Sequence, residues 1–488
     1  MERGQERAGS AGGLWGRASR HGGRGRPPVA IALGLALALL APATVQATAL
    51  RPKLIAKVGY GSTPPAFART ADGTLHVAFE SNRSWGDAFN GVGALSISPS
   101  GHVGAEVQAL SWDDPSGGSP NGIPGLAVLP SGALEATFGG SPSGDDGPWG
   151  ISSGDGGATW SAPVDVGSGS MEFGDSYVPV AVSGGTPVLA AGCCGGIVVQ
   201  QGFGTGAPTY LLTDSTDNAA GNTDLAADAG TGAVVASWTS NAGSGGVYAQ
   251  QIAPTRGALQ KVPVPAQYGT GLALILAARD TGPGVFGAYP ANYGDTTHIR
   301  LMRYGGGSVA VSSVRGLHAN VWGAATGNDG RIWVIWYGTI NGQGTMAVTR
   351  SNRAVTRFEP VRLYRYDWSY LFTLSGDGRL GPLDLLIGGT PTTKTCCGTG
   401  GIYYARILPV LSAGIAVSAL GADKFRLKVN VTDAGDAVKG ATVSAKAKSA
   451  TTNSNGDAKL IVSGRPHGRI TVTVGDSGYQ ALRLSVKL

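Results

Sequence analysis

One arrangement recurs along most of the 488-residue chain: two apolar segments joined by a tight turn, a longer Gly/Asn/Asp loop, and two more apolar segments. The turn between the third and fourth segments falls near residues 99, 155, 204, 255, 306 and 352, at intervals of 56, 49, 51, 51 and 46 residues. Short β-branched segments bounded by Gly and Asp are typical of strands. Each unit must bury its apolar faces against its neighbours, so the repeat predicts an array of four-stranded sheets.

The composition agrees with an all-β chain that has many turns. The chain holds 81 Gly and 27 Pro, only 14% of its residues are charged, and 42% are hydrophobic, which is enough for a core. Four-stranded units at this period predict a β-propeller with seven blades by repeat count and six as the alternative. The seventh unit ends at its third strand. We expect the early segment Lys53–Val58 to supply the fourth strand and close the ring.

The first 47 residues have the layout of a secretory signal peptide. Six Arg residues precede the apolar run Val29–Leu40, and small residues follow it. The run is shorter than the roughly 20 residues that span a bilayer, although an uncleaved anchor is the alternative. Cleavage would lower the formal net charge from +6 to +2. We therefore expect a secreted or surface-associated protein without a transmembrane segment and without a nucleic-acid partner.

The segment Ser153–Trp160 matches the Asp-box pattern S-x-D-x-G-x-T-W at Ser153, Asp155, Gly157, Thr159 and Trp160. Residues 351–353 with Phe358, and residues 98–101, look like eroded copies at the same place in their units. Over residues 48–410 the chain therefore resembles the sialidase (neuraminidase)/BNR-repeat propellers. The resemblance implies that these turns are structural and lie on the face away from the active site, because Asp and Ser satisfy backbone N–H groups in the turn.

The resemblance also sets expectations for catalysis. In the family an Arg-Ile-Pro motif precedes a turn like Thr70–Leu75, but Thr63 stands at the arginine position here. Standard sialidase catalysis, with a Tyr nucleophile and an arginine cluster around a carboxylate, is therefore not expected. The residues that would form a replacement catalytic site in the loops are Arg83, Asp87, Glu172, Tyr293, Arg315 and Arg365. Solvated loop charges are the alternative interpretation.

Aromatic residues fall in or near the same loops. Those that would form a ligand-binding rim are Trp85, Trp112, Tyr289, Trp336, Tyr337 and Trp368. Stacked aromatic rings on one rim indicate a surface for sugars or proteins. The alternative is that they pack at the edge of the core and bind no ligand.

The four cysteines form two adjacent pairs, Cys193-Cys194 and Cys396-Cys397. Export favours disulfides, and we favour a ring within each pair because the third and seventh units are far apart around a propeller. A four-cysteine metal site is the alternative, although zinc ligands are normally spaced by two to four residues. The six His residues are scattered. We expect no metal and no cofactor.

The pattern changes near residue 411. Residues 411–488 alternate apolar and polar positions in short strands, and the turns at 435–443, 452–458 and 478–479 resemble those of a carboxypeptidase-regulatory-like or bacterial Ig-like sandwich. This segment holds eleven Lys and Arg against five Asp, a net charge of +6, which leaves −4 for residues 48–410. The asymmetry predicts docking to an anionic cell-surface polymer or to the propeller, with a solvated spacer as the alternative.

These observations favour a secreted two-domain protein whose loop face recognises extracellular glycans or glycoproteins. One alternative is an exo-glycosidase of the exo-α-sialidase type. The other is a structural or interaction protein of the cell surface. Ligand binding without turnover would separate the first interpretation from the second, and failure to bind glycans would favour the third.

Overall fold

The computed structural model describes residues 48–58, 64–81, 90–111, 125–140, 147–167, 178–193, 196–204, 206–212, 219–240, 246–263, 274–291, 297–392 and 400–488. These residues form strands and turns, with one three-residue 3-10 helix, η3 (Asn328–Gly330). The all-β fold class is therefore confirmed. Nine sheets contain the strands of the described residues, and seven of them share one plan.

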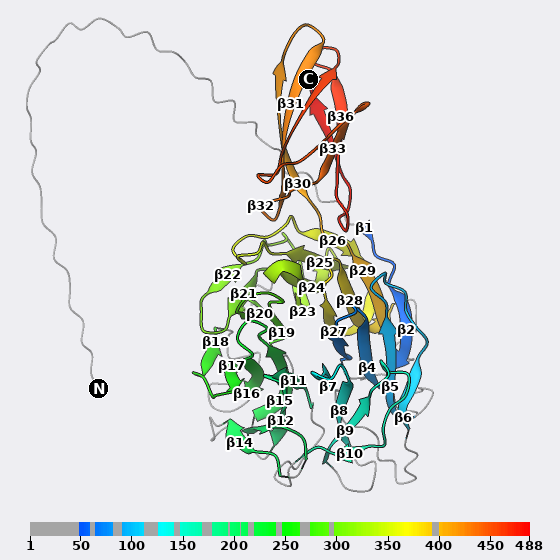
Figure 1. The fold of residues 1–488 in the computed structure, drawn as a ribbon, viewed down its shortest axis with the longest axis vertical. Helices are drawn as coiled ribbons and strands as arrows, with labels where there is room; N and C mark the ends of the chain where they lie inside the picture. Colours follow the sequence, from blue (N-terminus) through cyan, green and yellow to red (C-terminus); the bar gives the residue numbers. More distant parts are fainter. Residues whose placement is uncertain are drawn as a thin grey trace, which may run out of the picture. The chain divides into compact units, whose positions relative to one another are not determined.

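Five of the seven sheets have four strands that pair in chain order, and the other two also take strands from the start of the chain. Figure 1 shows the sheets following one another around a ring. The first sheet holds β3 (Ala66–Arg69), β4 (Leu75–Ser81), β5 (Gly91–Ile97) and β6 (Val107–Ser111), and the second holds β7 (Gly125–Val128), β8 (Leu134–Gly140), β9 (Gly147–Ser153) and β10 (Val164–Asp165). The third holds β11 (Val180–Ser183), β12 (Thr186–Cys193), β13 (Gly196–Gln201) and β14 (Thr209–Leu212).

The next two sheets repeat the plan. The fourth holds β15 (Ala219–Ala227), β16 (Val234–Ser240), β17 (Gly246–Ala253) and β18 (Gln260–Val262), and the fifth holds β19 (Leu276–Ala278), β20 (Val285–Pro290), β21 (Ile299–Arg303) and β22 (Ser308–Ala310). The turns between third and fourth strands fall where the repeat places them.

The last two sheets borrow strands from the start of the chain. The sixth holds β23 (His318–Thr326), β24 (Ile332–Ile340), β25 (Gln343–Arg350) and β26 (Arg362–Arg365), with β1 (Thr48–Ala49) parallel to β26. The seventh holds β27 (Trp368–Asp377), β28 (Leu383–Pro391) and β29 (Gly400–Ile407), and β2 (Lys53–Val58) pairs with β29 as its fourth strand. This confirms the expectation that residues 53–58 complete the last sheet.

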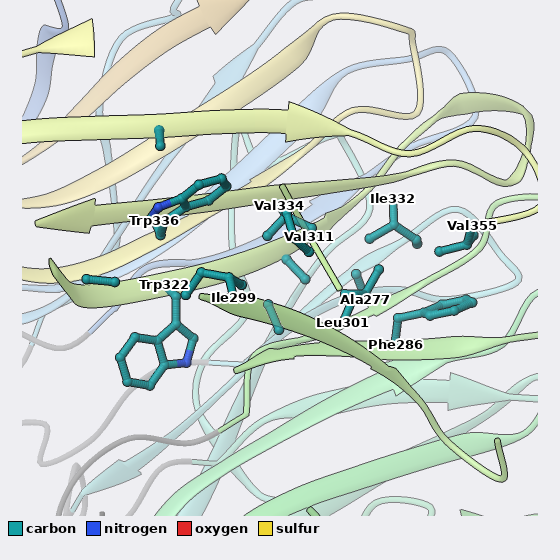
Figure 2. Packing of buried hydrophobic residues seen from close by; sticks show 14 of the residues in the cluster. Ala277, Phe286, Ile299, Leu301, Val311, Trp322, Ile332, Val334, Trp336 and Val355 are labelled. Atoms are coloured by element: carbon teal, nitrogen blue, oxygen red, sulfur yellow. The ribbon is translucent and has the colours of Figure 1, made fainter. Parts of the chain in front are cut away.

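Hydrophobic clusters join each sheet to the next. One cluster joins the fifth and sixth sheets, and Figure 2 shows Leu301 and Phe286 from one sheet near Ile332 and Val334 from the other. Because both faces of these sheets are covered, strands such as β24 read as nearly continuous apolar runs. The equivalent cluster between the seventh and first sheets closes the ring.

A buried ion network also crosses that closure. Arg69 at the end of β3 donates from Nε to Asp377 Oδ1 and from Nη2 to Asp384 Oδ2, both at 2.7 Å. Tyr404 donates its hydroxyl proton to the other oxygen of Asp384 at 2.7 Å. All three charged side chains are 3% exposed or less. Buried charges persist only when they are paired, so this network ties the first sheet to the last.

The ring has two unlike faces. We call the face with the turns between first and second strands and between third and fourth strands the Asp-box face. We call the opposite face, where second strands lead into third strands and one sheet leads into the next, the loop face. In the sixth sheet, Arg331 and Arg353 lie at the Asp-box face, and Gln343 and Arg365 lie at the loop face.

Residues from Ser412 onward form a separate pair of sheets around one core. One sheet holds β30 (Ser412–Ala419), β31 (Lys424–Asp433), β32 (Asp436–Ala437) and β35 (Asp457–Ser463), and the other holds β33 (Thr442–Ala445), β34 (Lys448–Thr451), β36 (Arg469–Gly475) and β37 (Leu482–Lys487). Burial alternates along β31 and β35, which matches a sheet with one face on the core and the other in water. We call residues 411–488 the C-terminal unit.

Candidate functional site

The Asp-box turn is built from side chains that bond to the backbone of their own turn. Ser153 Oγ accepts from the N–H of Gly157 at 2.8 Å and donates to Asp155 Oδ1 at 2.8 Å. Asp155 accepts from the Thr159 N–H at 2.9 Å and from its hydroxyl at 2.6 Å. The Thr159 hydroxyl bond is the main reason why the pKa of Asp155 falls to about 2. The Trp160 indole N–H closes the turn on the Gly157 carbonyl at 3.2 Å.

The eroded copies keep part of this bonding. Asn352 Oδ1 accepts from the N–H groups of Thr356 and Arg357 at 2.8 and 3.1 Å, in the place of an aspartate. Ser98 Oγ accepts from the N–H of His102 at 3.1 Å. These bonds organise turns and leave the side chains engaged with the backbone. The turns therefore explain local structure and do not by themselves form a reactive site.

Two of the expected rim aromatics lie in the core. Trp336 is 0% exposed in the cluster between the fifth and sixth sheets, and Figure 2 shows it beside the ribbon of β24. Tyr289 is 2% exposed in the cluster between the fourth and fifth sheets. Neither side chain offers a ring face to an external sugar, which corrects the expectation of a rim position. Both lie in the second strand of their sheet, which is covered on both sides.

The other two described rim aromatics belong to a cluster where the sixth sheet leads into the seventh at the loop face. Trp368 packs edge-on against Tyr403 with ring centroids 5.0 Å apart and against Tyr366 at 4.8 Å. The Tyr337 hydroxyl accepts from the N–H of Trp368 at 3.3 Å, and burial raises the pKa of Tyr337. Trp368 is 9% exposed and Tyr337 is 7% exposed, so both are buried beneath the exposed residues at this place on the loop face.

Exposed groups surround this corner. Asp367 is exposed, and its Oδ1 accepts from the Gly344 N–H at 2.7 Å, which orients the carboxylate. Tyr370, near the start of β27, is 44% exposed and lies against Phe372, with ring centroids 6.1 Å apart. Arg365 is exposed at the end of β26. We call Arg365, Asp367 and Tyr370 the loop-face corner.

The two described arginines of the expected replacement site lie on different strands of the sixth sheet. Arg365 ends β26, which has β1 on its outer side, and Arg315 is in the segment that leads into β23 at the inner edge. Three strand spacings of about 4.8 Å separate β26 from β23, or about 14 Å. Arginines so far apart are poorly placed to bind one carboxylate together.

Several expected residues lie outside the described part of the chain: Arg83, Trp85, Asp87, Trp112, Glu172, Tyr293, Cys194, Cys396 and Cys397. Cys193 ends β12, where it pairs with Gly196. The catalytic, disulfide and signal-peptide expectations that involve these residues stay predictions. Among the described residues, no group of three or more His, Cys, Asp or Glu is arranged to hold a metal ion. No helix of the described chain is long and apolar enough to cross a membrane.

Two carboxyl groups with raised pKa values lie inside the ring. Burial raises the pKa of Glu135, in β8, to about 7. Burial also raises the pKa of Asp224 to about 6, although Asp224 accepts from the N–H groups of Leu225 and Leu276 at 2.9 and 2.7 Å. Asp224 joins the fourth sheet to the fifth. Both lie in strands, so we interpret them as parts of the sheet framework.

The most elaborate charged cluster joins the Asp-box face to the C-terminal unit. Arg350, 0% exposed, donates from Nη2 to Asp433 at 2.7 Å and from Nε to Glu359 at 3.0 Å. Arg331 Nη2 lies 3.2 Å from the same oxygen of Asp433 and 2.8 Å from Asp436. Burial alone would lower the pKa of Arg350, but the Glu359 and Asp433 carboxylates outweigh it and raise that pKa. We call these five residues the junction network.

Tyr479 and two aromatic ring contacts of Arg350 add to the junction. The Tyr479 hydroxyl donates to Asp433 Oδ2 at 2.7 Å, and burial raises the pKa of Tyr479 to about 12, so the phenol keeps its proton. Arg350 also lies over the rings of Trp333 and Tyr479, at 5.2 and 5.6 Å. The guanidinium is thus held by carboxylates at its edges and aromatic rings at its faces.

A tight turn delivers the two carboxylates of the C-terminal unit. Asp433 and Asp436 pair across the hairpin between β31 and β32, and the two residues between them, Ala434 and Gly435, have φ values of 50° and 97°. Positive φ at both central positions is the geometry of a two-residue hairpin turn, and Gly435 adopts it without strain. Sequence reasoning missed this pair. Its signal was that two of only five acids in a basic segment lie three residues apart.

Comparison with known proteins gives no family. No family model matches the chain, and no curated protein matches it. Among solved structures, the WD40 domain of SCAP from fission yeast is 8% identical, with 90% of this chain and 98% of that chain covered and a TM-score of 0.39. The NanB sialidase from Streptococcus pneumoniae is 8% identical, with 74% and 70% covered and a TM-score of 0.38.

An α-L-arabinofuranosidase from Clostridium thermocellum is 11% identical, with 61% of this chain and 92% of that chain covered and a TM-score of 0.33. At these identities and TM-scores the similarities carry no argument about what this chain binds or catalyses. The fold assignment rests on the sheet order and on the clusters that join successive sheets.

Proposed function

We propose that this protein recognises extracellular glycans or glycoproteins through its loop face and does so without standard sialidase catalysis. The observation that carries the proposal is the division of the ring into two faces. The Asp-box face holds structural turns and the junction with the C-terminal unit. The loop face is the opposite one, so a ligand there does not compete with that junction.

The loop-face corner has the chemistry of a sugar site. Tyr370 offers an exposed ring, whose face suits the C–H groups of a pyranose. Asp367 offers a carboxylate fixed by the Gly344 N–H, which suits a pair of hydroxyl donors. Arg365 adds a cation for an acidic sugar. A few oriented polar groups beside an aromatic surface are characteristic of small-ligand sites.

The separation of Arg315 and Arg365 favours recognition over hydrolysis. A clamp on one carboxylate needs arginines that converge, and these two lie at strands of the sixth sheet that are three strand positions apart. The absence of the family's Arg-Ile-Pro motif before Thr70 points the same way. Export through residues 1–47 would bring this face to extracellular glycans.

The test is a glycan array probed with the full chain, combined with a turnover assay on a panel of sialosides and arabinosides. We expect binding without turnover, and a loss of about 5- to 10-fold in affinity for Tyr370→Ala, which is the size of one aromatic contact. The matched control is Leu380→Ala. Leu380 is 40% exposed at the opposite end of the same sheet, in the turn between β27 and β28.

Turnover of any glycoside by the wild type would replace this proposal with the exo-glycosidase alternative. Binding to no glycan would replace it with the structural alternative. Equal losses for Tyr370→Ala and Leu380→Ala would place the binding site elsewhere than the loop-face corner.

A further inference from the structure

The C-terminal unit directs two of its five acids toward the junction and all of its bases outward. Of its five carboxylates, Asp433 and Asp436 face arginines of the sixth sheet. All eleven of its Lys and Arg side chains are exposed. No ion pair between residues that the structure describes involves any of these eleven. The surface away from the junction therefore holds eleven cations and three carboxylates, which is more basic than the sequence count of +6 suggests.

One row of cations follows a single strand. Burial alternates along β31, so Phe425, Leu427 and Val429 enter the core and the residues between them point outward. Those outward residues include Lys424, Arg426 and Lys428. Alternate residues of a strand are about 6.7 Å apart, so the three cations span about 13 Å in a straight line.

A fourth cation widens the row. Lys459 on β35 is directly opposite Lys428 in the register, and both are exposed. We call Lys424, Arg426, Lys428 and Lys459 the basic sheet face. Like charges directly opposite each other on neighbouring strands destabilise a sheet, so this placement costs folding energy unless an anion lies between them.

The neighbours of the row decide which anion fits. On the β30 side the cross-strand partners of Arg426 and Lys428 are Ser418 and Ala416, which are too small to cover the cations. The outward positions of β31 hold no aromatic side chain, and single-stranded nucleic acids need such rings for stacking. Membrane-surface binding needs a cluster of apolar groups, whereas Ile461, at 53% exposure, is the one apolar side chain at the outward positions of β31 and β35. The carboxylate of Asp457, also outward on β35, is bonded to Asn430 at 2.9 Å at the end of the row.

We infer that the basic sheet face binds a linear anionic polysaccharide, with its sulfate, phosphate or carboxylate groups along the row from Lys424 to Lys428. A straight, flat row of cations matches a polymer whose charges recur along its length. The junction network holds this surface in a fixed relation to the Asp-box face, on the side away from the loop face. This inference is independent of the function proposed for the loop face.

The experiment measures binding of the full chain to heparin and to polygalacturonate over a range of salt concentrations. The test variant is K424Q/R426Q/K428Q/K459Q. The matched control, K439Q/K446Q/K448Q/R483Q, removes the same number of exposed charges from turns and from the other sheet of the C-terminal unit, at positions where no two of the four are paired across strands. Thermal unfolding of both variants confirms that they fold.

We expect the test variant to lose about 10- to 100-fold in affinity at low salt and to lower the slope of log K against log[salt] by about 2–3, since each neutralised anion releases about 0.7 counterion. The control is expected to change affinity less than about 3-fold by the same relation. Equal losses in both variants, or no binding to either polysaccharide, would overturn the inference. Tighter binding to duplex DNA or to phosphatidylserine vesicles than to both polysaccharides would also overturn it.

Discussion

Asp433→Ala tests whether the junction network holds the C-terminal unit to the ring. The carboxylate of Asp433 is 1% exposed and lies 2.7 Å from Arg350 and 3.2 Å from Arg331. At an effective dielectric constant of about 20, each pair contributes about 5–6 kcal/mol of Coulomb attraction. Burial of the three ions opposes that gain by several kcal/mol per ion. Removing one partner of a buried pair therefore costs about 3–5 kcal/mol, because the other charges stay buried.

The assay is amide hydrogen exchange at Arg353, whose N–H donates to Asp436 Oδ2 across the junction at 2.9 Å. If exchange requires the junction to open, a loss of 3–5 kcal/mol speeds exchange by about 140- to 4,000-fold. Asp457→Ala is the matched control. Asp457 is exposed in the same unit and accepts from Asn430 at 2.9 Å, so we expect a change within about 0.5 kcal/mol.

The double variant R350A/D433A sharpens the test. Because it removes both charges of the closest pair, its penalty is expected to be smaller than the sum of the two single penalties by about 1–3 kcal/mol. The reasoning is refuted if Asp433→Ala speeds exchange at Arg353 no more than Asp457→Ala does. Strictly additive penalties would refute it as well.

Three further predictions concern the ring. Among the described cations, Arg69→Leu leaves buried Asp377 with only the partly exposed Arg379 and buried Asp384 with only Arg406, at 3.7 Å. It should cost about 3 kcal/mol of stability, measured by chemical denaturation, whereas the exposed Arg303→Leu should cost less than about 0.5. Because the pKa of Glu135 is raised to about 7, the stability that its protonated form contributes to the fold is fully present below pH 4.5 and is lost as the pH rises through 7. Between pH 4.5 and 7, Glu135→Gln should therefore reduce the fall in unfolding free energy by about 1–2 kcal/mol, because solvent screens part of the effect. An unchanged pH profile of stability would contradict this. The lowered pKa of Asp155 gives the opposite pH dependence: the stability from its hydrogen bonds is fully present above pH 3.8 and is lost as the pH falls through 2. Asp155→Ala should speed hydrogen exchange at the Thr159 amide at pH 7 and leave glycan binding unchanged.

The repeat was readable from the sequence because it depends on local chemistry. The Asp-box residues satisfy their own turn through bonds that span at most four residues, so the motif alone predicts the turn. The closing strand was predictable for a different reason. A sheet with three strands leaves an edge to pair, and residues 53–58 are the strand-like segment without a unit of its own.

Burial of individual aromatics was not readable in the same way. Trp336 and Trp368 are both tryptophans in strands next to loops, so the sequence gives them the same expected position. However, Trp336 is in a second strand covered by sheets on both sides, whereas Trp368 starts an inner strand beside Tyr366 and Tyr403. Spacing along the chain does not say which neighbouring sheet covers a side chain.

By itself, the sequence determined the period of the units, their turns, the strand that closes the ring and the basic character of residues 411–488, because strand alternation and turn bonding act over a few residues. Only the tertiary structure decided that Asp433 meets Arg350, 83 residues earlier in the chain, and that this contact is at the Asp-box face. Such a contact depends on how two packed units meet, which no short-range pattern encodes. The same meeting turns two acids inward and leaves the cations of the C-terminal unit outside.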